Sequence, residues 1–437
     1  MKTSFVNRTS ISFVFVFNIL CIVYTVVFAL SLKKVELVWG YMDYAGMQWF
    51  SFFINDTFFW LMLLLIVIIT IINWFLLSVG ENGIADFWFY FILITYLIPN
   101  IIYSAATQRI DFLNYIFSML FLLNFAMSLY IFKKVRFAAF AKVLSPNFII
   151  IASYTIVFVT LFALIAKYGL PKVISIFDSN AVSVQRSTLV AFPTWLSYSY
   201  NASIGVFIPI LLCLKKNRDL YRKIILCLVL ILFGLYGANR GPILIGIVFA
   251  LFILTKNFWS RMNYKQLILF IFIVVLFIVI IAYLYLETNK NTLGLLYWRA
   301  LVIPSGVTEI WVKYFSENNL KRGISDISVL KNFSQSANYP VYFKQIYNLG
   351  NLNAGVIAEA YSRYGIFGSI VMGCSLGFIL CYLEFLLRGI KKITTSLLLS
   401  SSLVYLVNVE LTVVLLTKGL IYMFILLILS DISKITE

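Results

Sequence analysis

The sequence predicts an all-α, polytopic membrane protein. Of its 437 residues, 62% are hydrophobic and only 12% are charged, whereas soluble domains carry roughly 25% charged residues. Each helical crossing of a hydrocarbon layer about 30 Å thick needs about 20 apolar residues. We therefore expect a single membrane domain over 1–437, with room for about a dozen spans and their loops and for no separate soluble domain of ordinary size.

Successive apolar windows divide the chain into about twelve candidate spans. The first, at 11–30, follows Lys2 and Arg8. It is longer than a signal-peptide core and lacks a small-residue cleavage site, which predicts a retained helix. The other windows lie at 57–79, 86–106, 110–132, 148–168, 193–214, 223–239, 241–255, 266–286, 362–386, 393–413 and 415–431.

The basic residues predict the orientation of these spans. Cytoplasmic loops are enriched in Lys and Arg, so a cytoplasmic N-terminus requires a basic cluster in every second loop. The turn at 81–86 lacks a cation, but the other inner loops and the C-terminal tail follow the rule. Their clusters lie at 133–142, 215–223, 256–265, 388–392 and 434. Both termini are therefore expected in the cytoplasm, and the loops and anionic headgroups account for much of the net charge of +17.

The same topology predicts one large external loop at 287–353. Structureless loops longer than about 15 residues are uncommon in compact proteins, so this loop is expected to have its own structure. It contains cations that the cytoplasmic enrichment does not explain, namely Lys290, Arg299, Lys313, Lys321, Arg322, Lys331 and Lys344. An anionic partner at the outer face would explain them.

Several chemistries are disfavoured by composition. Histidine is absent, which removes the commonest general base and metal ligand. The five cysteines all fall in apolar runs, so neither a disulfide framework nor a thiolate metal site is indicated. No nucleotide-binding loop, dinucleotide fingerprint or zinc-protease motif occurs, and no basic face for nucleic acid is evident. We expect neither a metal nor a cofactor.

A short interruption between two apolar runs, at 237–242, contains the first candidate site residues. Arg240 follows Asn239 and is flanked by glycines, with almost no loop on either side. A charge at membrane depth is costly and tends to face a polar cavity, which favours a functional Arg240. The alternative is a tight turn whose arginine reaches the outer headgroups.

A second candidate segment, at 353–368, opens the tenth span. Glu359 and Arg363 lie four residues apart, so they share a helix face and can pair. Asn353 and Tyr361 add the hydrogen-bonding and stacking surfaces that sugars require. A local ion pair at a helix start is the alternative. Glycines at 365, 368, 373 and 377 indicate close helix packing.

Three further cations are predicted on the outer side. They are Arg186 before the sixth span, Arg299 before Pro304, and Lys418 between the last two spans. Together with Arg240 they could bind a diphosphate through charge-assisted hydrogen bonds.

The ordered set of motifs resembles the Wzy-type oligosaccharide repeat-unit polymerases of O-antigen and capsule synthesis. The likeness rests on the Arg-Gly turn at 237–241, the R-x-x-x-I-P segment at 299–304 followed by Tyr314 and Phe315, and the N-A-G-x-x-x-E-A-Y-x-x-Y-G-x-x-G stretch at 353–368. It implies a GT-C-like membrane glycosyltransferase without a metal. The enzyme would move a growing glycan from undecaprenyl diphosphate to the non-reducing end of an incoming lipid-linked unit, at the outer face of the bacterial inner membrane.

The resemblance also suggests roles for particular residues. Arg240 and Arg299 would hold the donor diphosphate as leaving-group charge develops. Glu359 would be the base for the acceptor hydroxyl, or would orient Arg363. Lys418 stands where an arginine is expected, and Arg363 matches no role known for the family. A chain-length regulator in the same membrane would be a partner.

Other functions remain open on the sequence alone. A flippase for lipid-linked oligosaccharides would also have about twelve spans, but flippases generally have two similar halves and short loops. A glycosyltransferase that uses a polyprenyl phosphate sugar would have an acidic pair in the first outer loop, where Asp43 is isolated. The related O-antigen ligases depend on a histidine that this chain lacks.

Overall fold

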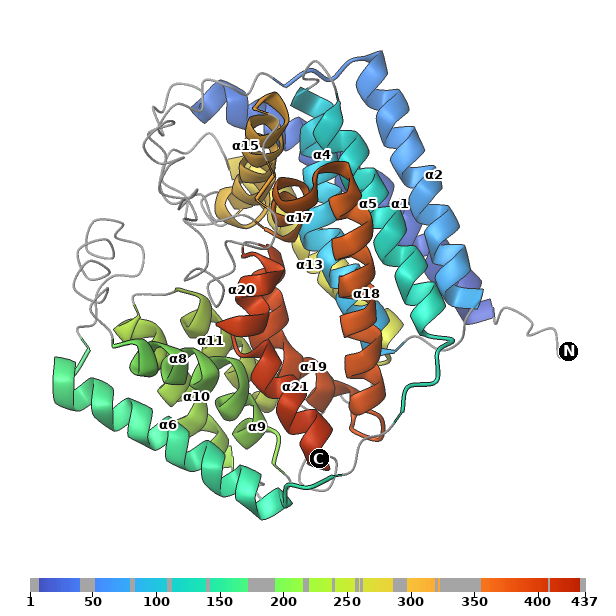
Figure 1. Cartoon of the computed structure of the whole chain (residues 1–437). Coiled ribbons are helices and arrows are strands. Elements are labelled where there is room, and N and C mark those ends of the chain that lie inside the picture. The colour runs from blue at the N-terminus through green and yellow to red at the C-terminus, as the bar shows by residue number, and fades with distance from the viewer. Residues whose placement is uncertain are drawn as a thin grey trace, which may run out of the picture. The chain divides into compact units, whose positions relative to one another are not determined.

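The computed structural model describes the chain in fourteen segments and shows it to be helical (Figure 1). The described residues are 8–39, 52–78, 83–107, 112–138, 142–171, 193–214, 220–237, 240–255, 259, 262–285, 297–318, 321–322, 355–407 and 409–432. Within these segments there is no β-strand, and the only extended pairing is an isolated bridge between Leu144 and Ser430. The predicted all-α class is confirmed.

Eight helices of the described segments are long and apolar enough to cross a membrane. They span Ile11–Lys34, Asp56–Leu76, Ile84–Thr107, Leu113–Phe132, Pro146–Tyr168, Thr194–Leu212, Tyr264–Leu284 and Val356–Leu386. Large apolar side chains lie exposed along the outer faces of several of them, as at Phe148, Ile151, Phe158 and Phe162 of one helix. Exposed apolar stripes at helical spacing are what contact with lipid requires.

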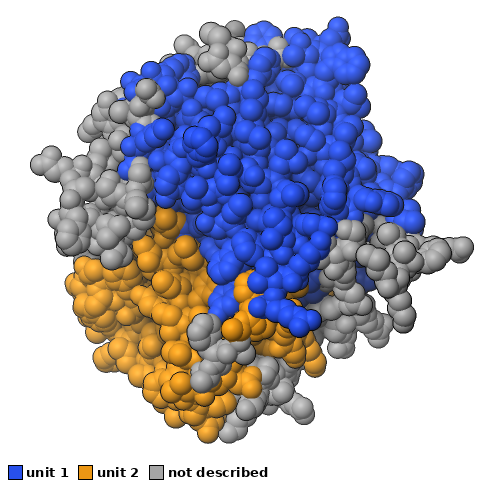
Figure 2. Space-filling view, turned by 45° about the vertical axis from the view of Figure 1, so that its right-hand side comes forward, with its two compact units in different colours: residues 1–136, 263–382, 406–411 blue, residues 137–262, 383–405, 412–437 orange. Residues whose placement is uncertain are grey.

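The described residues form two compact units, shown in different colours in Figure 2. Unit 1 comprises 1–136, 263–382 and 406–411, and unit 2 comprises 137–262, 383–405 and 412–437. The chain passes from one unit to the other after residues 136 and 262, and again within α18 (Gly368–Leu386), η6 (Val404–Val407) and α20 (Leu411–Leu416).

Unit 1 is organised around one buried helix. Its other helices are α1 (Arg8–Trp39), α2 (Asp56–Ser78), α5 (Leu113–Phe132), α13 (Tyr264–Tyr285), η3 (Trp298–Val302), α15 (Ile303–Glu317), α17 (Val356–Tyr364), η5 (Gly365–Phe367) and most of α18. The buried helix consists of α3 (Ile84–Ile92), the π turn η1 (Leu93–Leu97) and α4 (Ile98–Thr107), and 89% of its apolar window lies inside the protein. The π turn precedes Pro99, which has no backbone N–H and therefore cannot donate to the Ile94 carbonyl one π turn earlier. The Ile94 carbonyl accepts a hydrogen bond from the Tyr24 hydroxyl at 3.4 Å.

Unit 2 contains a second set of helices. They are α6 (Pro146–Tyr168), α8 (Thr194–Ala202), η2 (Ser203–Phe207), α9 (Ile208–Leu212), α10 (Leu220–Tyr236), α11 (Arg240–Leu254), α19 (Lys392–Leu403) and α21 (Leu420–Leu429). The first begins at Pro146, slightly before the predicted span at 148–168. Ser145 caps it by accepting the Phe148 N–H at 3.3 Å, and Pro146 suits the first turn.

The last two predicted spans differ most from the structure. In place of continuous helices at 393–413 and 415–431, the chain forms α19, η6, α20 and α21, none longer than 12 residues. Gly419 adopts φ 90°, a left-handed conformation that ends the apolar run as a helix, and Glu410 lies in a non-helical link. Mean hydropathy over a window does not detect either break.

An ion pair tests the predicted sidedness within unit 1. Asp86 at the start of α3 pairs with Lys133 at the end of α5. The sequence predicts both residues in inner loops, so the two predicted inner loops do lie at the same end of this unit. The pair also explains why the loop at 81–86 tolerates a carboxylate, since its charge is matched by the neighbouring loop.

Glycines of α18 allow close packing, as their spacing predicts. A Cβ at Gly377 would lie 1.7 Å from Ser128 Oγ and one at Gly373 would lie 3.2 Å from Asn124 Cβ, both in α5. A Cβ at Gly368 would lie 1.9 Å from the Ala360 carbonyl oxygen. Gly365 has a different role, because its φ of 60° ends α17.

These distances predict unequal costs for two alanine substitutions. Gly368→Ala is expected to lower the free energy of unfolding by about 2–3 kcal/mol, because backbone atoms must move to admit the methyl group. Gly373→Ala in the same helix is the matched control and should change it by less than about 1 kcal/mol. Thermal unfolding of the purified protein in detergent, followed by tryptophan fluorescence, measures both. Equal unfolding temperatures for the two variants would contradict the packing argument.

Candidate functional site

The segment that opens the tenth predicted span folds as α17, and its helix position is tightly constrained. Gly355 precedes it, and a Cβ there would lie 2.4 Å from Tyr96 Oη and 2.6 Å from the Val407 carbonyl oxygen. Tyr96 in turn shares a hydrogen bond of 2.9 Å with Thr308 of α15. α17 is buried on all sides from Val356 to Arg363, and it packs against α15 and α5 (Figure 1).

Glu359 and Arg363 form the ion pair that their spacing predicts. Arg363 Nε donates to Glu359 Oε1 at 2.9 Å, and the two side chains are 1% and 0% exposed. The pair is not isolated. Glu359 Oε2 also accepts the backbone N–H of Leu411 at 2.5 Å, and Arg363 Nη2 donates to Glu410 Oε2 at 3.1 Å.

Arg322, from the middle of the predicted external loop, also belongs to this network. Its guanidinium donates to both oxygens of Glu410, at 2.8 Å from Nη1 and 3.4 Å from Nη2. Its backbone N–H donates to the Ser362 carbonyl at 2.8 Å. The guanidinium carbon lies 5.0 Å from the centre of the Trp311 ring, within the range of a cation–π contact.

We call Arg322, Glu359, Arg363 and Glu410 the charge network. It contains two guanidinium groups and two carboxylates, so its formal charges balance. Removing each ion from water costs several kcal/mol, which only close pairing offsets. All four residues belong to unit 1. The network therefore joins the middle of the predicted large loop, the segment that opens the tenth predicted span and the link after η6.

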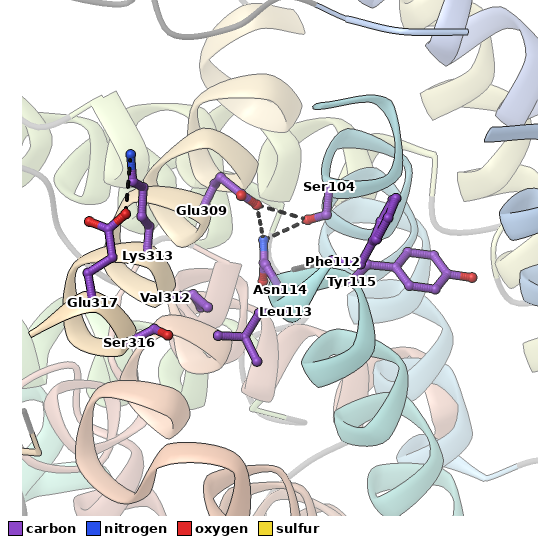
Figure 3. Close-up of a pocket in the computed structure, with 10 residues that line it drawn as sticks. All are labelled: Ser104, Phe112, Leu113, Asn114, Tyr115, Glu309, Val312, Lys313, Ser316 and Glu317. Atoms are coloured by element: carbon purple, nitrogen blue, oxygen red, sulfur yellow. Dashed lines mark hydrogen bonds and ion pairs between the residues drawn. The ribbon is translucent and has the colours of Figure 1, made fainter. Parts of the chain in front are cut away.

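A cavity of about 340 Å³ lies nearby in unit 1, between α4, α5 and α15 (Figure 3). Its polar lining includes Ser104, Asn114, Glu309, Lys313 and Glu317. α15 contributes to both features, since Trp311 contacts Arg322 and Glu309 lines the cavity. No group of acidic, cysteine and histidine side chains suited to a metal occurs in the described part of the chain.

The structure describes only some of the predicted site residues. Arg186, Asn239 and Asn353 lie outside the described residues. Arg240 begins α11 in unit 2 and Arg299 lies in η3 in unit 1, but only their backbone is described. Glu359, Arg363 and Tyr361 lie together on α17. The Tyr361 ring packs edge-on against Phe117, with 5.0 Å between the ring centroids.

Lys418 lies in unit 2, in the turn between α20 and α21 and outside the eight apolar spans. Its ammonium is 3.4 Å from Asn201 Oδ1 and 4.9 Å from the centre of the Tyr405 ring. Burial lowers the pKa of this ammonium below its ordinary value. The Lys418 carbonyl would meet a Cβ at Gly205 at 2.2 Å, so η2 approaches this turn closely.

Sequence reasoning did not single out Glu309, Asn114 and Glu410 as site residues, and it counted Arg322 only among the loop cations. A signal existed for Glu410, which interrupts an apolar run, because ionisable residues in such runs are functional candidates. Glu309 and Asn114 carry no such signal. They are 195 positions apart in the chain and meet only through the packing of α15 on α5.

Comparison of the chain with protein-family models, with curated proteins and with solved structures finds no match.

Proposed function

We propose that this chain is a membrane glycan polymerase. It would transfer a growing glycan from undecaprenyl diphosphate to the non-reducing end of an incoming lipid-linked oligosaccharide repeat unit, for O-antigen or capsule synthesis. The reaction would take place at the outer face of the bacterial cytoplasmic membrane. The full fold would have about twelve spans in a GT-C-like arrangement, with both termini in the cytoplasm and no metal in the active site.

The charge network carries this proposal. Charged side chains are costly to bury in an apolar helical protein, so they mark candidate functional sites. Here they occur in the segment at 353–368 that resembles the polymerases, and they connect that segment through Glu410 to Arg322, in the middle of the predicted large loop. Such a network would hold the loop in a fixed position over the ends of the helices. A reaction between two lipid-linked substrates needs this kind of fixed geometry.

The geometry favours one of the two roles considered for Glu359. Its carboxylate accepts hydrogen bonds from Arg363 and from the Leu411 N–H, and the side chain is 0% exposed. A general base must reach the proton of the acceptor hydroxyl, and a fully buried carboxylate does not. We therefore propose that Glu359 positions Arg363. As the resemblance implies, Arg240 and Arg299 would hold the diphosphate of the donor.

The glycan pattern of a strain lacking the gene tests the polymerase function. Gel electrophoresis should show a single repeat unit on its lipid acceptor, and the wild-type gene should restore the ladder. Arg240→Ala should leave the ladder at least about 100-fold weaker, because loss of one transition-state contact costs about 3 kcal/mol. Arg388→Ala is the matched control, since Arg388 is an exposed cation at a predicted inner loop and should restore the ladder in full.

Protein levels are compared by immunoblot, so that poor expression is not mistaken for lost activity. If the deletion instead abolishes even the single unit and leaves intermediates on the cytoplasmic side, the protein acts before polymerisation. The flippase function would then replace the polymerase. A full ladder with Arg240→Ala at normal protein level would remove Arg240 from the site.

A further inference from the structure

The cavity between α4, α5 and α15 contains a buried carboxylate held by neutral hydrogen-bond donors (Figure 3). Glu309 is 7% exposed. Its Oε2 accepts from Asn114 Nδ2 at 2.7 Å and from Ser104 Oγ at 3.3 Å. The Asn114 Nδ2 also donates to Ser104 Oγ at 2.6 Å, so the three side chains converge on one point in the cavity wall.

A second layer of hydrogen bonds holds Asn114 in place. Asn114 Oδ1 accepts from Ser118 Oγ at 3.2 Å, and Ser118 Oγ accepts from Asn100 Nδ2 at 2.7 Å. All of these side chains are buried. The carboxylate is thus positioned before any ligand arrives, which reduces the entropy lost on binding.

An unusual backbone conformation also borders the cavity. Phe112 has φ 44°, and it is the only non-glycine residue with a positive φ in the described segments. This left-handed conformation is strained for a side chain of that size and persists only where the surroundings maintain it. Phe112 lines the cavity immediately before α5, so it supplies aromatic surface beside the polar cluster.

The lining fits a neutral, polyhydroxylated ring. The cavity volume of about 340 Å³ lies at the lower end of the range for small-molecule sites. A carboxylate oxygen accepts hydrogen bonds from hydroxyl or acetamido groups, and an aromatic face covers the apolar side of a sugar ring. The charged side chains of the lining are Glu309, Glu317 and Lys313, and Lys313 pairs with Glu317 at 3.5 Å. This charge pattern disfavours a diphosphate.

We propose that this cavity binds a sugar residue, with Glu309 and Asn114 as the groups that recognise its hydroxyl or acetamido substituents. The assignment of this sugar as the non-reducing end of the acceptor rests on the polymerase function proposed above. Binding of a sugar does not itself depend on polymerisation.

A reactive thiol at the cavity wall tests the proposal. Ser316 lines the cavity and is partly exposed, whereas four of the five native cysteines are buried. The Ser316→Cys variant, purified in nanodiscs, is treated with a small maleimide, and the wild-type rate is subtracted. The probes are the neutral and N-acetylated monosaccharides released from the host's surface polysaccharide, each at 50 mM as a rough upper concentration for weak sugar binding. At least one should slow modification about threefold or more.

Two controls assign the effect to the cavity. Adding Glu309→Gln to Ser316→Cys should abolish protection. If this double variant does not fold, Glu309→Asp is used in place of Glu309→Gln. Asn318→Ser, at the exposed end of the same helix and outside the cavity lining, should retain protection. Sodium diphosphate should not protect. The proposal is overturned if no sugar slows the reaction, if the Glu309 variants are protected equally, or if diphosphate protects instead.

The outcome separates this proposal from the polymerase function. Protection by a sugar without any effect of gene deletion on the glycan ladder would leave a sugar site in a protein of another function. A ladder that depends on the gene, with no protection, would leave the polymerase and remove this cavity from acceptor binding.

Discussion

Arg363→Met is expected to lower the free energy of unfolding by about 3–5 kcal/mol. The arginine contacts Glu359 and Glu410 with two of its nitrogens, and its side chain is 1% exposed. Methionine fills a similar volume but leaves the carboxylates of the buried Glu359 and the partly exposed Glu410 without this guanidinium. The cost of the unpaired charge then exceeds any gain from the apolar side chain. Chemical denaturation in detergent, followed by tryptophan fluorescence, measures the change.

A double variant distinguishes an unpaired charge from a packing defect. In Arg363→Met the Glu410 carboxylate keeps its pairing with Arg322, whereas Glu359 loses the Arg363 guanidinium. Adding Glu359→Gln removes that negative charge and should recover about 1–2 kcal/mol of the loss. Arg388→Met, at an exposed position, should change the stability by less than about 0.5 kcal/mol. If Arg363→Met and Arg388→Met unfold alike, the network contributes no measurable stability and its proposed positioning role loses its basis.

Hydropathy predicts helices well where the sequence is uniformly apolar. The window at 110–132 corresponds to Leu113–Phe132, and the window at 148–168 corresponds to Pro146–Tyr168. In the second case a serine cap and a proline mark the start, so local chemistry adds to the average. Average hydropathy fails after 393, because the non-helical links that contain Glu410 and Gly419 interrupt the helices without lowering the mean of a long window.

The candidate site is predictable only as far as it is local. Glu359 and Arg363 lie one helical turn apart, so their spacing predicts the pair. Arg322 and Glu410 are 88 positions apart, and no periodic pattern relates them. The predicted topology puts Arg322 in the external loop and Glu410 near the outer end of a span, so a contact between them is possible, but the topology does not specify it. The selection comes from helix packing, which brings the three segments together at α17.

The charge network also predicts that exchanging the charges of Arg322 and Glu410 does not restore the stability of the protein. Arg322→Glu and Glu410→Arg should each lower the free energy of unfolding by more than about 3 kcal/mol, because each strands a like charge in a buried site. In a simple pair, combining the two substitutions would restore the attraction. Here Glu410 binds Arg363 as well as Arg322. An arginine at position 410 would face Arg363, so the double exchange should remain destabilised and should not restore the glycan ladder.

The Lys313 and Glu317 pair provides the matched control for this experiment. It joins the same two types of charge on α15, but its side chains are 32% and 61% exposed and 3.5 Å apart. Lys313→Glu with Glu317→Lys should therefore leave stability within about 0.5 kcal/mol of the wild type, since exposed pairs contribute little. If the Arg322→Glu and Glu410→Arg double variant were as stable as the wild type, the two residues would act as an isolated pair. Arg363 would then have no part in holding the loop, and the network as a unit would have to be abandoned.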